Sequence, residues 1–302
     1  MMIVTVAVAT RGRPAALLRC VEAIARQATP PSELIVVDQA PTPEARAAVQ
    51  NSGLPAARYL EQEPLGLSAS RNLALRTCAG SLLAVTDDDC APDSTWLEAI
   101  AAAFERPTPP AAVTGPVLPL GDAAPGTFAV SLRDSKIPVD HAGRVLPWDV
   151  GSGGNFAASV AVLREHGGWD ERLGAGSPGR AAEDTDLLYR LLRRGFTIRY
   201  EPRAVVRHEW QTLARRLATR WSYGYGIGAM CGIWLRQGDP YAARMLAGYA
   251  RLHVRPLLGG LRHADARRIE EHGRALASLV PGLLHGARVE PPPSTASMVA
   301  PR

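Results

Sequence analysis

The sequence predicts an α/β fold with a mainly parallel, doubly wound sheet, helices on both of its faces and a helical extension towards the C-terminus. Apolar runs at residues 2–9, 33–40 and 81–86 lack polar alternation, as is typical of strands covered on both faces. Segments with apolar residues at helical spacing separate these runs. Strands that alternate with helices favour a parallel sheet with right-handed crossovers.

The first elements follow one another in a regular order. After the strand at residues 2–9, Pro14 stands where proline favours a helix start, and helical spacing continues to Gln27. The run ELIVVDQA predicts a second strand that ends on Asp38. The stretch EARAAVQNSG then predicts a short helix closed by Gly53, and ARYLEQ predicts a third strand.

The next helix lies in PLGLSASRNLALRTCAG. Its start is expected at Ser68 or Ser70, because serine is a favoured N-cap, and its end at Gly80. The run SLLAVT after it predicts a further strand, which leads directly into three consecutive aspartates.

These aspartates, Asp87, Asp88 and Asp89, repel one another unless a cation, a cationic partner or open water lies beside them. A solvated turn is the simplest explanation. Ligands of doubly wound sheets, however, bind at the carboxyl ends of the strands, where Thr10, Asp38 and the triplet are all expected. The turn after the first strand is ATRGRP, and no GxGxxG or GxxxxGK[ST] motif is present, so a dinucleotide or P-loop site is not predicted.

Composition limits the class of protein. The 302 residues are 46% hydrophobic and 21% charged, which excludes a disordered or collagen-like chain. The net charge is +5, with arginines concentrated after residue 190, but zinc-finger spacing and RNA-binding aromatic signatures are lacking, so no nucleic-acid partner is predicted. Four widely spaced cysteines, no secretory signal and no apolar stretch of spanning length predict a cytoplasmic protein, soluble or peripheral on the inner face of the membrane.

A second acidic cluster stands at the start of a predicted helix, AAEDTDLLYRLLRRG. Its first turn holds Glu183, Asp184 and Asp186, which complementarity to the helix dipole would explain alone. The preceding GAGSPGR segment has the glycine content of a substrate lid. Asp184 is therefore a candidate catalytic base, and His208, at the end of the predicted strand RAVVRH, is a candidate metal ligand.

Several motifs in order resemble family 2 glycosyltransferases with the GT-A fold over residues 3–211. They are VAVATRGRP, ELIVVDQ, GLSASRNLAL, AVTDDDCAPDSTWL, GSGGNFAAS with GGWDE, and the AEDTDLLYRLLRRG helix. The resemblance implies a catalytic domain at 1–210, made of a nucleotide-binding half (1–106) and an acceptor-binding half (107–210). A helical extension at 211–288 and a disordered tail at 289–302 are expected to follow.

The resemblance also implies roles for individual residues. Asp184 would be the general base with Glu183 as its acidic neighbour, and Asp89 and His208 would bind a divalent metal, Mg²⁺ or Mn²⁺. The nucleotide would be held by Thr10, Arg11, Asp38, Arg71, Asp87 and Asp88, and the donor sugar or acceptor would be lined by Gly154, Asn155, Trp169 and Asp170.

The implied reaction is transfer of one sugar from a nucleotide-diphosphate sugar to a hydroxyl of a glycan, a lipid-linked acceptor or a small molecule. It would proceed with inversion in a single displacement. Gln39 replaces the second acid usual after the second strand, and Leu217 replaces the glutamine of the QxxRW motif of processive synthases, which argues for single addition.

Other readings stay open at this point. An inactive nucleotide-sugar-binding protein would keep the fold without turnover, and a nucleotidyltransferase would need a basic glycine-rich loop, of which ATRGRP is a poor version. Aromatic and arginine residues in 211–285 predict either packing, which is preferred, or contact with an anionic membrane.

Overall fold

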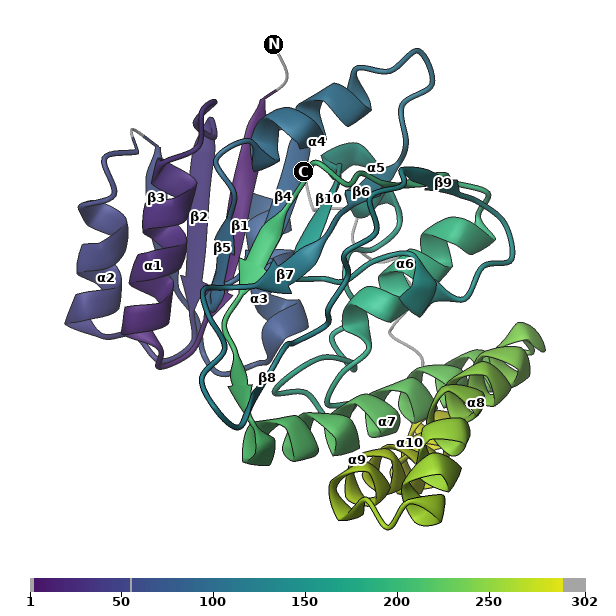
Figure 1. Cartoon of the computed structure of the whole chain (residues 1–302). Helices are drawn as coiled ribbons and strands as arrows, with labels where there is room; N and C mark the ends of the chain where they lie inside the picture. The colour runs from purple at the N-terminus through teal and green to yellow at the C-terminus, as the bar shows by residue number, and fades with distance from the viewer. Residues whose placement is uncertain (1–2, 55, 290–302) are drawn as a thin grey trace. The chain divides into compact units, whose positions relative to one another are not determined.

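The computed structural model describes residues 3–54 and 56–289. The described chain forms two compact units, one within residues 1–178 and 183–216 and the other within 179–182 and 217–302 (Figure 1). The tail predicted to be disordered at 289–302 falls, apart from Val289, outside the described residues.

An eight-stranded sheet with the order β3-β2-β1-β4-β10-β6-β11-β9 forms the centre of the first unit. Its first four strands, β1 (Val4–Thr10), β2 (Glu33–Asp38), β3 (Ala57–Glu61) and β4 (Leu82–Asp87), are all parallel. The second half is mixed, because β10 runs antiparallel to both of its neighbours and β9 antiparallel to β11. These remaining strands are β6 (Ala112–Thr114), β9 (Val139–His141), β10 (Asn155–Ser159) and β11 (Ile198–Tyr200).

Helices cover both faces of this sheet, as the uniformly apolar strands predict. In β1 the side chains of Val4, Val6 and Val8 belong to one core, whereas Ala7 belongs to the other. The first core includes α1 (Pro14–Ala25), α2 (Pro43–Gln50) and α4 (Trp96–Phe104), and the second includes α3 (Leu67–Thr77), α5 (Val160–Glu165) and α6 (Glu183–Arg193). The predicted α/β fold is thus confirmed.

Strand register brings the sequence-predicted residues to one edge of the sheet. Thr10 pairs with Asp38 across β1 and β2, and Ala9 pairs with Asp87 across β1 and β4. A small sheet, β5-β12-β7, adjoins this edge, and within it His208 pairs with Cys90. The elements not yet placed are β5 (Cys90–Pro92), β7 (Val117–Pro119), β12 (Val206–His208), the pair β8 (Thr127–Phe128) and β13 (Gln211–Thr212), and the 3-10 helix η1 (Pro147–Asp149).

The N-cap predicted for α3, Ser68 or Ser70, was wrong by two or four residues. The N-cap is Gly66, whose φ of 98° favours glycine, and neither serine caps the helix. Instead Ser68 donates a hydrogen bond to the Leu173 carbonyl at 2.6 Å, and Ser70 accepts one from Gln39 at 2.6 Å. The helix also ends at Thr77 instead of Gly80: the Cys78 amide donates to the Ala74 carbonyl, and Arg164 donates to the carbonyls of Leu75 and Cys78.

The second unit consists of long helices, α7 (Leu213–Arg236), α8 (Tyr241–Arg262), α9 (Ala266–Ala277) and α10 (Leu279–Arg288). Glycines allow α7 and α10 to approach closely: a Cβ on Gly228 would collide with the Leu279 carbonyl, and one on Gly282 with the Tyr225 carbonyl. The glycine-rich WSYGYGIGAMCGIWL stretch is therefore a helix-packing surface. None of the helices in the described ranges has the length and apolar character needed to cross a bilayer.

Candidate active site

The acidic triplet at the end of β4 is held by cationic and hydroxyl groups. Asp88 is buried, and one of its carboxylate oxygens accepts a hydrogen bond from Thr10 at 2.7 Å while the other lies 2.5 Å from Nη2 of Arg13. Burial raises the pKa of Asp88 to about 6, although the Arg13 charge opposes this shift. Asp88 thus ties the end of β4 to the end of β1.

Asp89 is also buried but lies among three basic groups. Its Oδ1 is 3.3 Å from Nε2 of His208, and its Oδ2 is 2.6 Å from Arg13 and 2.8 Å from Arg215. Burial acts to raise the pKa of Asp89, but the charges of His208, Arg13 and Arg215 together lower it. This carboxylate is therefore ionised at neutral pH.

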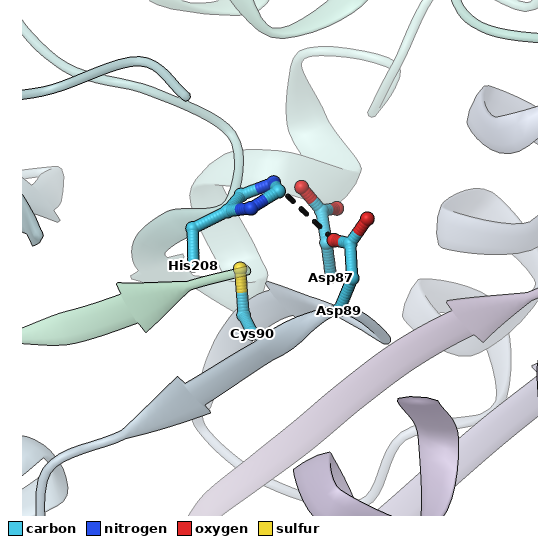
Figure 2. Close-up of side chains that lie close together, drawn as sticks. All are labelled: Asp87, Asp89, Cys90 and His208. Atoms are coloured by element: carbon cyan, nitrogen blue, oxygen red, sulfur yellow. Dashed lines mark ion pairs between the residues drawn. The ribbon is translucent and has the colours of Figure 1, made fainter. Parts of the chain in front are cut away.

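Asp87, Asp89, Cys90 and His208 form one group whose ligand atoms all lie within 4.8 Å of one another (Figure 2). Nδ1 of His208 lies 2.8 Å from the Glu209 carbonyl oxygen. Since a carbonyl only accepts, Nδ1 carries a proton, and Nε2 is the nitrogen that faces Asp89. Burial raises the pKa of the Cys90 thiol well above its usual value, so the thiolate is not available. Two carboxylates and one imidazole nitrogen remain, a donor set that suits a hard or borderline divalent cation.

Arg71 links this group to the second acidic cluster. Its guanidinium is buried between Asp87, at 3.0 Å, and Glu183, at 3.1 Å. Burial raises the pKa of Glu183 to about 7, with the adjacent Asp184 acting in the same direction and Arg71 opposing both. The N-terminal turn of α6 is therefore joined to the end of β4 through one side chain.

Asp184 is held in a fixed orientation by backbone amides. The amide of Gly153 donates to its Oδ2 at 2.5 Å, and the amide of Thr185 donates to its Oδ1 at 2.8 Å. A Cβ on Gly153 would lie 2.6 Å from Oδ2 of Asp184, and one on Gly154 would lie 2.9 Å from Oδ2 of Asp87. Two consecutive glycines thus let one loop lie against a carboxylate of each cluster.

Asp38 lies at the end of β2, beside Thr10. It is buried, and it accepts hydrogen bonds from the Ala40 amide at 2.8 Å and the Tyr59 hydroxyl at 2.6 Å. Gln39, which replaces the acid usual at this position, binds the loop before α3: its amide nitrogen donates to the Gly66 carbonyl at 2.8 Å. Arg11, predicted beside Thr10, is exposed to solvent.

The residues predicted near the donor sugar or acceptor differ in exposure. The Asn155 side chain is buried, donating to the carbonyls of Pro116 and Ala204 and accepting from Trp96. The Trp169 ring is also buried and lies 5.8 Å from the Arg71 guanidinium, whereas Asp170 pairs with Arg172 at 2.6 Å. Asn155 therefore anchors the glycine loop to neighbouring segments, and Trp169 packs against Arg71.

Comparison with known proteins identifies the family. The family model described as glycosyltransferase like family 2 matches residues 2–224. The chain belongs to this family. The pre-mycofactocin glycosyltransferase of Mycobacterium tuberculosis, in both the CDC 1551 and H37Rv strains, is 31% identical over 188 residues. That alignment covers 61% of this chain and 38% of the relative, so the chain spans well under half the length of the curated relatives it matches.

Solved structures show the same fold at low sequence identity. A mannosyltransferase from Pyrobaculum calidifontis, in complex with GDP-Man and Mn²⁺, has a TM-score of 0.58 and 18% identity, over 95% of this chain and 86% of that one. Residues 1–349 of S. aureus TarS, solved alone and with UDP, each have a TM-score of 0.58, over 93% of this chain and 92% of theirs, at 14% and 15% identity. These structures confirm the predicted GT-A fold, and the family model confirms the predicted membership of glycosyltransferase family 2.

Two arginines of this glycosyltransferase were not foreseen in the site. Arg13, in the turn before α1, contacts both Asp88 and Asp89, and Arg215, near the start of α7, contacts Asp89. Arg13 stands directly before the helix-starting Pro14, and this position could have indicated that it lies at the edge of the sheet with the site residues. Arg215 was visible only as part of a general excess of arginine.

Proposed function

We propose that this family 2 glycosyltransferase moves a single sugar from a nucleotide-diphosphate donor to an acceptor hydroxyl, with a divalent cation at the donor and inversion at the anomeric carbon. One observation carries the proposal: the ligand atoms of Asp87, Asp89 and His208 converge within 4.8 Å, and Arg71 connects them to the helix turn that bears Asp184. A cation site and a base thus lie beside each other.

Asp89 and His208 would hold the cation, Mg²⁺ or Mn²⁺, with Asp87 on the ribose side. When bound, the cation supplies positive charge for the diphosphate leaving group. The structural neighbours solved with GDP-Man and Mn²⁺ or with UDP support this class of donor and cofactor. Arg13 and Arg215 lie against Asp89, at 2.6 and 2.8 Å, and would pair with phosphate oxygens when the donor binds.

The nucleoside would lie over the ends of β1 and β2. Asp38, whose oxygens already accept from Ala40 and Tyr59, would use its remaining acceptor capacity for base or ribose, and the exposed Arg11 would offer a planar cation to either. Thr10 and Asp88 would act in this site chiefly through their mutual hydrogen bond, which fixes the strand ends. Arg71 would orient Asp87 from below.

Asp184 would act as the general base. The acceptor oxygen attacks the anomeric carbon from the face opposite the diphosphate, and its proton passes to the Asp184 carboxylate. The carbon–oxygen bond to the diphosphate breaks and its electron pair leaves with the phosphate, so no covalent enzyme intermediate is needed. Glu183 would position Arg71, whose guanidinium lies 3.1 Å from its carboxylate.

The acceptor would be held by the loop of Gly154 and Asn155 and by the segment of Trp169 and Asp170. Asp170 is the candidate for direct contact, since the side chains of Asn155 and Trp169 are buried. The hydroxyl would belong to a glycan, a lipid-linked molecule or a small molecule. Leu217 in place of the glutamine of QxxRW supports addition of a single sugar.

The test is Asp184→Asn, with Asp122→Asn as a matched control at an exposed position. Transfer of labelled sugar should fall by about 10²- to 10⁴-fold in Asp184→Asn, with nucleotide affinity nearly unchanged, because loss of a general base costs about this much. The control should keep full activity. Normal turnover in Asp184→Asn would remove this residue from the role of base.

The same assay separates the competing functions. Release of pyrophosphate from a nucleoside triphosphate would indicate a nucleotidyltransferase. Nucleotide-sugar binding without turnover in the wild type would indicate a binding protein that has lost catalysis.

A further inference from the structure

The outward face of α8 bears a row of apolar side chains that no other helix of the second unit covers, as far as the chain is described, up to residue 289. Val254, Leu258 and Leu261 are 40%, 58% and 57% exposed, and their spacing of four and three residues places them along one side of the helix. Their exposure contrasts with the opposite side of α8, where the buried residues are Ala242, Met245, Tyr249, His253 and Gly260. The helix therefore has two apolar rows, and packing within the unit explains only one.

Arginines run beside the exposed row. Arg244, Arg251, Arg255 and Arg262 recur at spacings of seven, four and seven residues, so they share one helix face. All four are exposed, and α8 contains no acidic residue. Within residues 3–54 and 56–289 none of these four arginines forms an ion pair with a carboxylate.

The charge of the surrounding segment has the same sign. Residues 211–288 contain twelve arginines and four acidic residues, a net charge of +8, whereas the whole chain carries only +5. The remainder of the chain is therefore slightly acidic. A positive field concentrated on one segment attracts an anionic surface and repels a second copy of the same segment.

The aromatic residues of the helical extension do not form this face of α8. Trp234 and Tyr249 are buried within the second unit, at 8% and 7% exposure, which confirms the packing interpretation for these two. The exposed aliphatic row of α8 is a separate feature, visible only once the buried side of the helix is known.

We propose that the outward face of α8 docks on the surface of a bilayer that contains anionic phospholipids. The arginines would pair with headgroup phosphates, and Val254, Leu258 and Leu261 would enter the boundary between headgroups and acyl chains. Helices of this type lie in the plane of the interface, with binding that combines buried apolar area and electrostatic attraction. A nucleic acid would satisfy the arginines but would leave the aliphatic row in water. This inference goes beyond the proposed catalytic function and does not depend on it.

The first experiment is co-sedimentation of the full chain with vesicles of phosphatidylcholine alone or with about one third phosphatidylglycerol. Binding is expected only to the anionic vesicles and should weaken as salt increases. Equal binding to both vesicles, or no binding to either, would overturn the proposal.

Variants then locate the binding face. Arg251→Gln with Arg255→Gln should weaken binding at least about tenfold, since each arginine near a membrane surface contributes roughly a fivefold gain in affinity. Leu258→Ser with Leu261→Ser should weaken it as well, although the charge is unchanged. All four residues are exposed, so circular dichroism and thermal melting should remain like those of the wild type.

The matched control is Arg26→Gln with Arg76→Gln, which removes the same charge from exposed positions of the first unit. It should bind vesicles as the wild type does. If the control loses as much binding as the α8 variant, only net charge matters and the proposed face is wrong. Tighter binding to nucleic acid than to anionic vesicles, lost in the arginine variant but kept in the leucine variant, would likewise refute a lipid surface.

Discussion

Replacing Glu183 by glutamine should stabilise the fold at alkaline pH while doing nothing at acidic pH. The folded-state pKa of Glu183 is raised from 4.5 to about 7, chiefly by burial and then by the adjacent Asp184. A carboxyl group with a raised pKa holds its proton more tightly in the folded than in the unfolded chain. Its contribution to stability is therefore full below pH 4.5 and is lost as the pH rises through about 7.

The size of the effect follows from the shift. The pKa of Glu183 rises from 4.5 to about 7, and a pKa change of one corresponds to about 1.36 kcal/mol. The cost of ionising Glu183 in the folded chain is therefore at most roughly 3 kcal/mol. Glutamine removes this cost and keeps a carbonyl oxygen for Arg71, but it loses the attraction between the two charges. We expect a net gain of about 1–3 kcal/mol at pH 8, or an increase in Tm of roughly 2–10 °C.

The assay is thermal unfolding of wild type and Glu183→Gln at intervals from pH 4.5 to pH 8, with the exposed Glu63→Gln as control. The difference in Tm should be near zero at the acidic end and should grow through the titration window, while the control shows no such trend. A variant that is destabilised equally at both ends would refute the reasoning. Glu183 would then be an ionised partner that Arg71 stabilises at every pH.

Other substitutions test close approaches at glycine. Gly153→Ala would place a Cβ 2.6 Å from Oδ2 of Asp184 and displace that carboxylate. We expect kcat to fall at least about tenfold while donor affinity is retained. An unchanged kcat would show that catalysis does not require the position that Asp184 has in this structure. Gly228→Ala should lower the free energy of unfolding by about 1–3 kcal/mol, because its Cβ would collide with the Leu279 carbonyl. Gly273→Ala, where a Cβ meets nothing within 4 Å, should instead stabilise α9 by about 0.5–1 kcal/mol, and chemical denaturation measures both. Equal effects of these two changes would contradict the close packing of α7 against α10.

The fold could be predicted from the sequence because the segments whose residue pattern indicates strands and helices are also the segments that are buried in the core. The uniformly apolar runs of β1, β2 and β4 and the helix-starting Pro14 lie as expected, and parallel pairing then places Thr10, Asp38 and Asp87 at one edge. The first turn of α6, with Glu183, was equally visible as acids followed by a regular apolar stripe.

Contacts between segments distant in sequence could not be predicted in the same way. Arg215 reaches Asp89 across 126 positions of sequence, and no local pattern marks which of many arginines does so. Local pattern predicts that a serine caps α3, yet Ser68 donates to a carbonyl 105 residues away. The buried position of the Asn155 side chain could not be predicted for the same reason, since its three hydrogen-bond partners come from separate segments.

The most direct test of the proposed donor site is a thermal-shift panel of UDP, GDP, CDP and dTDP and their common sugars, each with and without Mn²⁺. A ligand at about a hundred times its Kd stabilises the folded state by roughly 2.7 kcal/mol, enough to raise Tm by several degrees. We predict a metal-dependent increase with one nucleotide in the wild type and in the exposed control Asp122→Ala, and its loss in Asp89→Ala. No shift with any nucleotide, or a shift that persists in chelator or in Asp89→Ala, would contradict the assignment of Asp89 and its neighbours as a metal-dependent donor site.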